Sequence, residues 1–215
     1  MTTTPTPGGI GRIGEHPVAR VGYGAMSIEH VPTVDDAARL LRRAIELGVN
    51  HIDTASFYGG GEVNRRIRHA LAPYRDDLLI VSKVGARSVS GGRIPLALAQ
   101  KPAELRAAVE LDLAELGLEQ IAVVNLRRAD IGPGLLAEGD QIVDLDDQLA
   151  EMIALRDEGK IGAIGISNVS LETVQRAVPA GIVCVQNAYN LLNRSHEDSL
   201  AFCADHDIAW VPYIP

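Results

Sequence analysis

A carboxylate, a phenol and an ammonium group lie near the ends of two consecutive predicted strands. Asp53 and Tyr58 occur in the segment HIDTASFYGGGE, and Lys83 ends the apolar run of LLIVSK. An isolated tyrosine keeps its proton until about pH 10. A neighbouring ammonium group favours the phenolate and lowers that pKa, while a carboxylate beside the ammonium keeps it charged and oriented. The three residue types therefore predict a phenol that can protonate a carbonyl oxygen near neutral pH.

Each of these residues also has a simpler explanation when it is taken alone. Asp53 stands just before Thr54, where a carboxylate could cap the turn that follows the strand. Tyr58 precedes a run of glycines and could pack within a loop. Lys83 follows an apolar run, so a solvated surface lysine is not expected there. The combination, rather than any single residue, predicts a catalytic site.

Segments in a fixed order along the chain resemble the aldo-keto reductase family: HIDTASFYGGGE, SKVG, the Ser-Asn of GIGISN, VQNAYN and VPYIP. The resemblance runs from about Val18 to the last residue. VVNLRRAD is similar to a bacterial branch that includes pyridoxal reductases. The resemblance implies an oxidoreductase that uses NADP(H) to reduce an aldehyde or ketone, with pyridoxal as one candidate. Tyr58 would be the general acid, and Lys83, held by Asp53, would tune it.

The family usually has a histidine at the end of its fourth strand, and the resemblance aligns Arg127 with that position. An arginine does not exchange a proton near neutral pH, but it offers N–H donors and positive charge to a carbonyl oxygen. We therefore predict that Arg127 orients and polarises the substrate or binds an anionic one. The alternative is that Arg127 pairs with a nearby loop acid such as Asp130.

The resemblance also implies which residues contact the nicotinamide of the cofactor: Met26, Asp53, Ser167, Asn168, Gln186 and Tyr213. Amide and hydroxyl groups suit a carboxamide, which presents both donors and an acceptor. As alternatives, Ser167 and Asn168 could cap the next helix, and Tyr213 could be a core residue. Members of the family bind the adenosine of the cofactor with residues that follow the seventh strand. Because the last predicted strand here is the seventh, we expect weak or absent cofactor binding by this chain.

Short apolar runs alternate with amphipathic helical stretches. The predicted strands are Val21–Met26, Asn50–Thr54, Leu79–Lys83, Ile121–Leu126, Ala163–Ile166, Val183–Gln186 and Ala209–Pro212. The predicted helices are Asp35–Leu47, Glu62–Ala72, Ala103–Leu116, Asp146–Glu158, Leu171–Val178 and His196–His206. Ser195 with Asp198 resembles a capping box for the last helix.

Repeated βα units fit either a doubly wound sheet or a (β/α)₈ barrel. A doubly wound dinucleotide fold would show GxGxxG after the first strand, and only Gly22-Tyr23-Gly24 occurs there. Polar residues instead gather at the ends of many different strands, as the site of a barrel requires. The sequence therefore predicts a (β/α)₈ barrel of the TIM type over residues 18–215. Residues 1–17 are expected to form a tail and a hairpin that closes the bottom.

The predicted barrel has seven strands, and the 215 residues fall short of the roughly 250 typical of this fold. We therefore expect a fragment of a longer reductase that lacks the last βα unit. Two unpaired parallel edges would favour aggregation, so the chain is expected to fold poorly alone. The loop Ala86–Lys101, with Gly91 and Gly92, is long enough to predict a role in substrate choice.

Composition narrows the class of protein. The net charge of −8 argues against a nucleic-acid surface, and no apolar run reaches the roughly 18 residues of a membrane span. The start, MTTTPTPGG, lacks the features of a signal peptide, which also predicts the cytoplasm. Cys184 and Cys203 are expected to be buried thiols. The histidines lack metal-ligand spacing, so no metal is expected.

Two other functions remain open at this stage. The first is a nucleotide-binding redox sensor or an inactive truncated reductase, which the missing histidine and the missing last unit favour. The intact set of Asp53, Tyr58 and Lys83 argues against it. The second is a phosphate-binding barrel isomerase or aldolase, which would need a glycine-rich phosphate loop late in the chain, and the sequence has none there.

Overall fold

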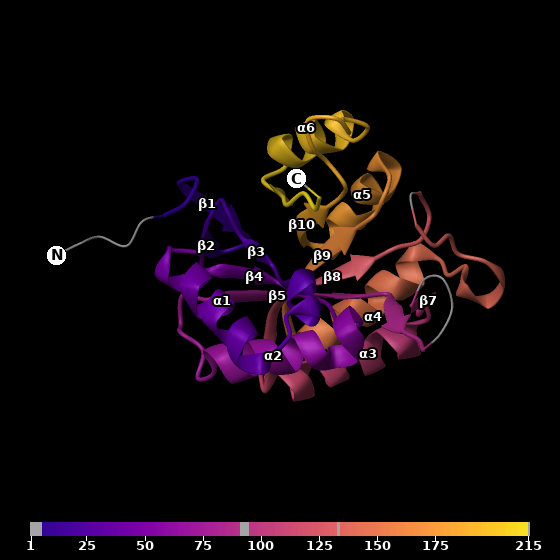
Figure 1. Cartoon of the computed structure of the whole chain (residues 1–215). Helices are drawn as coiled ribbons and strands as arrows, with labels where there is room; N and C mark the ends of the chain where they lie inside the picture. The colour runs from indigo at the N-terminus through magenta and orange to yellow at the C-terminus, as the bar shows by residue number, and fades with distance from the viewer. Residues whose placement is uncertain (1–5, 91–94, 133, 215) are drawn as a thin grey trace.

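A single parallel sheet organises the chain, and the computed structural model describes residues 6–90, 95–132 and 134–214 (Figure 1). The strand order is β11-β10-β9-β8-β5-β4-β3. Its strands are β3 (Tyr23–Gly24), β4 (His51–Asp53), β5 (Leu79–Val84), β8 (Ile121–Arg127), β9 (Ile161–Ser167), β10 (Ile182–Gln186) and β11 (Ala209–Trp210). Each strand pairs with the previous one of this sheet, without the reversal of order that a doubly wound fold has. This topology confirms an incomplete (β/α)₈ barrel, with β3 and β11 at the two edges.

Helices follow the strands and pack outside the sheet, with α1 to α4 along one side in Figure 1. The α-helices are α1 (Val34–Glu46), α2 (Glu62–Leu71), α3 (Pro102–Leu116), α4 (Leu145–Asp157), α5 (Leu171–Ala177) and α6 (Glu197–Asp205). Short 3₁₀ turns are η1 (Ala25–His30), η2 (Tyr58–Gly61), η3 (Gly139–Gln141) and η4 (Val178–Ala180). Ser170 caps α5 by accepting a hydrogen bond from the backbone N–H of Thr173, which leaves Ser167 and Asn168 free of that task.

Apolar side chains cover both faces of the strands, as the continuous apolar runs predict. One cluster lies between the strands and the helices and includes Leu41, Ile67 and Met152. A second cluster joins the hairpin to the strands: Ile13, Val18, Leu79, Val81, Val123 and Cys184. Cys184 and Cys203 are both buried free thiols, as expected.

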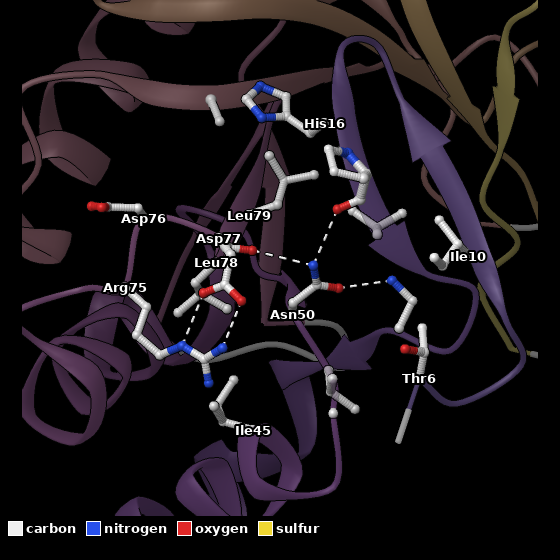
Figure 2. Close-up of a pocket in the computed structure, with 16 residues that line it drawn as sticks. Thr6, Ile10, His16, Ile45, Asn50, Arg75, Asp76, Asp77, Leu78 and Leu79 are labelled. Atoms are coloured by element: carbon white, nitrogen blue, oxygen red, sulfur yellow. Dashed lines mark hydrogen bonds and ion pairs between the residues drawn. The ribbon is translucent and has the colours of Figure 1, made fainter. Parts of the chain in front are cut away.

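An N-terminal hairpin, β1 (Ile10–Ile13) and β2 (His16–Ala19), packs against the starts of the strands. Asn50, just before β4, fixes it. The Asn50 side chain accepts from the backbone N–H of Ala19 at 2.7 Å and donates to the carbonyls of Pro17 and Asp77 at 3.1 and 3.2 Å. Figure 2 shows these bonds at the wall of a hollow of about 650 Å³. The expected tail overlaps residues 1–5, which lie outside the described residues.

Several predicted elements differ from the observed ones. The first strand is Tyr23–Gly24 rather than Val21–Met26, because the chain turns into η1 directly after Gly24. The capping box of α6 is not formed, since Ser195 donates to Asn193 at 2.7 Å and the cap residue is His196.

The predicted loop Ala86–Lys101 contains an antiparallel pair, β6 (Ala86–Ser88) with β7 (Leu96–Leu98). Its expected glycines, Gly91 and Gly92, lie outside the described residues.

Candidate active site

An ion pair joins the ends of two neighbouring strands. Lys83 of β5 places its Nζ 3.2 and 3.3 Å from the two carboxylate oxygens of Asp53, at the end of β4. The same Nζ lies 3.4 Å from the carbonyl oxygen of Thr54. Lys83 is 4% exposed, so this ammonium group lies beneath the surface. The pairing arises because β4 and β5 are parallel neighbours, whose carboxyl ends meet at one edge.

The ammonium of Lys83 keeps its charge despite burial. Burial by itself lowers the pKa of a lysine, because the charged form loses its hydration. Here Asp53 and Tyr58 outweigh that effect, and the pKa of Lys83 is raised above its ordinary value. A lysine held in this way is a fixed positive charge throughout the physiological range.

Tyr58 lies beside this charge on the turn η2. Lys83 Nζ is 5.7 Å from the centre of the Tyr58 ring, and Phe57 packs edge-on against the ring at 5.2 Å between centroids. The turn continues through glycines with positive φ, which an L side chain adopts only with strain. A Cβ on Gly61 would also lie 1.8 Å from a carboxylate oxygen of Glu115. The positive φ therefore favours glycine at position 61, on the turn that carries Tyr58.

Gln186, at the end of β10, also contacts the ion pair. Its Nε2 donates to Asp53 Oδ1 at 2.7 Å, although the two residues are 133 positions apart. Its Oε1 is buried and has no hydrogen-bond partner among the described residues. An unpaired buried acceptor is costly, so this oxygen is suited to a donor from a bound group. The structure thus brings Gln186, Asp53, Lys83 and Tyr58 together.

Other predicted cofactor residues lie at the same end of the sheet. Asn168, directly after β9, donates from Nδ2 to the carbonyls of Arg128 and Ile131 at 3.0 and 3.1 Å. Its Oδ1 accepts a hydrogen bond of 3.2 Å from the hydroxyl of Tyr213. Asn168 therefore fixes the loop after β8 as well as Tyr213. Ser167 is buried at the end of β9, next to Gln186 in the parallel register.

Met26 is separate from this group of contacts. It lies on η1 rather than in a strand and is 58% exposed. Its side chain makes no hydrogen bond to the other predicted site residues within the part of the chain that the structure describes.

Arg127 and Arg128 have different environments. The loop acid Asp130 binds Arg128, with a contact of 2.9 Å from Nη2 to Oδ1, so the alternative prediction that it pairs with Arg127 is wrong. Arg128 follows the strand and turns toward Gln148 of α4. The Arg127 side chain makes no ion pair with any residue that the structure describes. Arg127 and Asn125 share one face of β8, and Asn125 accepts from Cys184 at 3.2 Å inside the curled sheet.

Comparison with known proteins decides the family. The model of the aldo/keto reductase family matches residues 20–215. The chain belongs to the aldo/keto reductase family. It is 40% identical over 215 aligned positions to pyridoxine 4-dehydrogenase of Escherichia coli K12, covering 94% of this chain and 71% of that protein.

Solved structures of aldo/keto reductases share the fold. A glycerol dehydrogenase of Gluconobacter oxydans superposes with a TM-score of 0.81 at 26% identity, over 95% of this chain and 62% of that one. An aldo/keto reductase of Klebsiella pneumoniae, solved with NADP and acetate, gives 0.74 at 24%, over 94% of this chain and 65% of that one. This chain therefore spans about two thirds of the solved proteins that it resembles.

A buried network behind the aldo/keto reductase site escaped the sequence analysis. Asp112 of α3 is fully buried and accepts hydrogen bonds from Ser82 at 2.5 Å and Asn64 at 2.6 Å. The signal was present in the sequence. Asp112 lies three residues after Val109 and four before Leu116, on the apolar face of its helix. An acid at such a position needs partners, which identifies it as a residue of interest.

The hollow of Figure 2 lies away from this site. It is bounded by the hairpin and by residues at the starts of β4 and β5, whereas Asp53 and Lys83 lie toward the opposite ends of those strands. Within the described residues there is no group of three or more histidines, cysteines or acids that could hold a metal ion. No described helix is long and apolar enough to cross a membrane.

Proposed function

We propose that this protein reduces an aldehyde or ketone to an alcohol with NADPH, and that Tyr58 is the proton donor. Members of the family use NAD(P)H, and the observation that carries the assignment is the buried ion pair of Lys83 and Asp53. Its ammonium lies 5.7 Å from the centre of the Tyr58 ring. A buried positive charge thus lies beside a phenol, which is the arrangement that general acid catalysis by tyrosine requires.

The residues at the carboxyl ends of these strands have the functional groups that a nicotinamide needs. The unpaired Oε1 of Gln186 is a buried acceptor that a carboxamide N–H would satisfy. Ser167 and Asn168 would also contact the carboxamide, and Tyr213 would stack beneath the ring. Met26, on η1 directly after β3, would approach the cofactor through its backbone. When bound, NADPH supplies the hydride for the reduction. The preference for NADPH over NADH follows from the family resemblance.

The side chains of this chain perform the proton work. Tyr58 gives its hydroxyl proton to the substrate oxygen as negative charge develops there, and it takes the proton back in the reverse direction. Lys83 stays an ammonium because Asp53 and Tyr58 offset the effect of its burial, and its positive charge lies beside the Tyr58 ring. Gln186 fixes the Asp53 carboxylate through its 2.7 Å bond, which keeps Lys83 directed at the site.

Arg127 takes the place that a histidine has in the family. Its guanidinium cannot exchange a proton near neutral pH, so proton transfer depends on Tyr58 alone. Its N–H groups orient and polarise the substrate carbonyl or bind a negative group of the substrate. Support comes from its place on the inner face of β8 and from the pairing of Asp130 with Arg128, which leaves Arg127 without that acid.

Pyridoxal is the candidate substrate that the comparisons favour, because pyridoxine 4-dehydrogenase of E. coli is 40% identical to this chain. The test is NADPH fluorescence and consumption with pyridoxal, for this chain and for a version extended by the C-terminal part of that dehydrogenase. We expect the extended protein to bind NADPH and to reduce pyridoxal, and this chain to bind NADPH weakly. NADPH binding without any reduction would contradict the proposal and indicate a nucleotide sensor.

A further inference from the structure

One buried carboxyl group lies directly behind the proposed active site, on the outer side of the strands. Asp112 is in the middle of α3 and has no exposed surface. Its Oδ2 accepts from the hydroxyl of Ser82 at 2.5 Å, and its Oδ1 accepts from Nδ2 of Asn64 at 2.6 Å. Asn64 in turn accepts from the hydroxyl of Thr54 at 2.7 Å. All four side chains are fully buried.

The partners of Asp112 adjoin the residues of the site. Ser82 immediately precedes Lys83 in β5, and alternation along the strand directs the two side chains to opposite faces. Thr54 immediately follows Asp53 at the end of β4. Asn64 lies in the first turn of α2, which continues directly from the turn that carries Tyr58. One carboxyl group therefore ties together the three segments that present Asp53, Tyr58 and Lys83.

We propose that Asp112 is a positioning residue for this site, and that gain or loss of its proton changes how Lys83 is placed against Tyr58. The inference rests on the proposed carbonyl reduction. The ionised carboxylate accepts both bonds and holds the strand ends and the first turn of α2 in one arrangement. The protonated acid alters that arrangement at Ser82, next to Lys83.

The donors and acceptors of the network explain why the change falls on Ser82. Thr54 fixes the Asn64 amide by donating to its Oδ1, so Asn64 must present its N–H to Asp112 in either state. A protonated Asp112 therefore keeps Oδ1 as the acceptor and carries its proton on Oδ2. That O–H must donate to the Ser82 oxygen, and the serine hydroxyl then has to find another acceptor.

The proton equilibrium lies in the physiological range. Burial raises the pKa of Asp112 to about 7, although the bonds from Ser82 and Asn64 lower it. Among the charges around Asp112, Glu115 on the same helix raises the pKa and Lys83 of β5 lowers it. These charges are themselves paired, Glu115 with Arg65 of α2 and Lys83 with Asp53 of β4.

A variant that mimics the protonated acid tests the proposal. In Asp112→Asn, the new amide accepts from Asn64 and donates to Ser82, so packing is kept while the charge is lost. Both readouts are taken on the extended protein: the kcat of NADPH-dependent reduction between pH 5.5 and 8.5, and the NMR shift of the Lys83 side chain over the same range. Glu110→Gln, on the exposed side of α3, is the matched control.

We expect the wild-type kcat and the Lys83 shift to change with one common midpoint near pH 7, kcat by about tenfold, since small misplacements are costly. Asp112→Asn should remove that midpoint from the kcat and from the Lys83 shift, with kcat held at the low-pH value and KM unchanged. Glu110→Gln should keep the midpoint in both readouts. If Asp112→Asn fails to fold, Ser82→Ala should remove the midpoint from both readouts, because it removes the hydroxyl through which the proton on Asp112 acts on the strand beside Lys83.

An unchanged midpoint in Asp112→Asn, or in Ser82→Ala where that variant is the one used, would overturn the proposal. If the extended wild-type protein shows no reduction at any pH, the proposed function fails instead. The NMR shift of Lys83 then tests by itself whether Lys83 is coupled to Asp112, because this measurement needs neither cofactor nor turnover.

Discussion

Replacing Asp112 by asparagine should change how the free energy of unfolding depends on pH. The pKa of Asp112 is about 7 in the folded protein, against 3.8 as its ordinary value. Because the folded state favours the protonated acid, protonation of Asp112 stabilises the fold. This contribution to the free energy of unfolding is complete below pH 3.8 and is lost as pH rises through 7. The shift of about 3 pKa units corresponds to roughly 4 kcal/mol in total. Asp112→Asn has no titrating group at this position and therefore lacks this pH-dependent contribution to the free energy of unfolding.

The experimentally useful interval is pH 5 to pH 8. At pH 5 the folded acid is almost fully protonated and the unfolded one almost fully ionised, and at pH 8 both are ionised. Linkage then gives a loss of about 2.7 kcal/mol over the interval for wild type. Urea unfolding of wild type and Asp112→Asn at both pH values measures it as a difference between the two proteins. A difference that is equal at pH 5 and pH 8 would refute the argument from burial.

Other predictions concern the turn, the ion pair and the arginine. Gly61→Ala should unfold at lower urea concentration than Gly60→Ala. Gly60 has φ 58° and ψ 40°, within the left-handed region that an alanine can adopt, whereas Gly61 has φ 85° and ψ −8°, outside it. Equal midpoints would contradict this. Lys83→Met should abolish reduction and cost about 3 kcal/mol in urea unfolding, since it leaves Asp53 unpaired. The double variant with Asp53→Asn should recover stability but not reduction, and recovery of both would refute the role of Lys83. Arg127→Gln should raise KM about tenfold for 4-carboxybenzaldehyde, which corresponds to the loss of one charge-assisted hydrogen bond, but should not raise KM for its methyl ester. Equal effects on the two substrates would exclude anion binding.

The ionisation that tunes the site in this account weakens the fold. The charged form of Asp112 holds the strand ends, yet its burial without a cation is unfavourable. A polar group retained at the cost of stability is commonly found where function depends on it. Asp112 follows this pattern, because it is an acid on the apolar face of α3, between Val109 and Leu116.

The sequence predicted what depends on local pattern. Parallel strands end at one edge, so the proximity of Asp53 and Lys83 follows from placing each at a strand end. The position of β5 was predicted well because all its residues are buried and its first three, Leu79, Ile80 and Val81, form an apolar run. The hairpin β6–β7 was missed because its three-residue strands are too short for their alternation to be distinguished from a loop.

Contacts that depend on the curvature of the sheet could not be predicted. The bond from Gln186 to Asp53 joins two strands that are not neighbours in the sheet, and only the curl brings them together. The partner of Asp130 was mistaken because Arg127 and Arg128 are adjacent, and the turn after β8 decides which one meets it. Asp112 was recognisable as an acid on an apolar face, but its partners come from two other elements.

The most direct test of the central claim is the kcat of NADPH-dependent pyridoxal reduction by Tyr58→Phe, measured in the extended protein. Tyr74→Phe is the matched control, because the Tyr74 hydroxyl donates to the carbonyl of Leu116 at 2.7 Å and has only a structural role. We predict a loss of about 10² to 10⁴-fold for Tyr58→Phe and a value near wild type for Tyr74→Phe. Turnover by Tyr58→Phe close to that of wild type would contradict the assignment of Tyr58 as the proton donor.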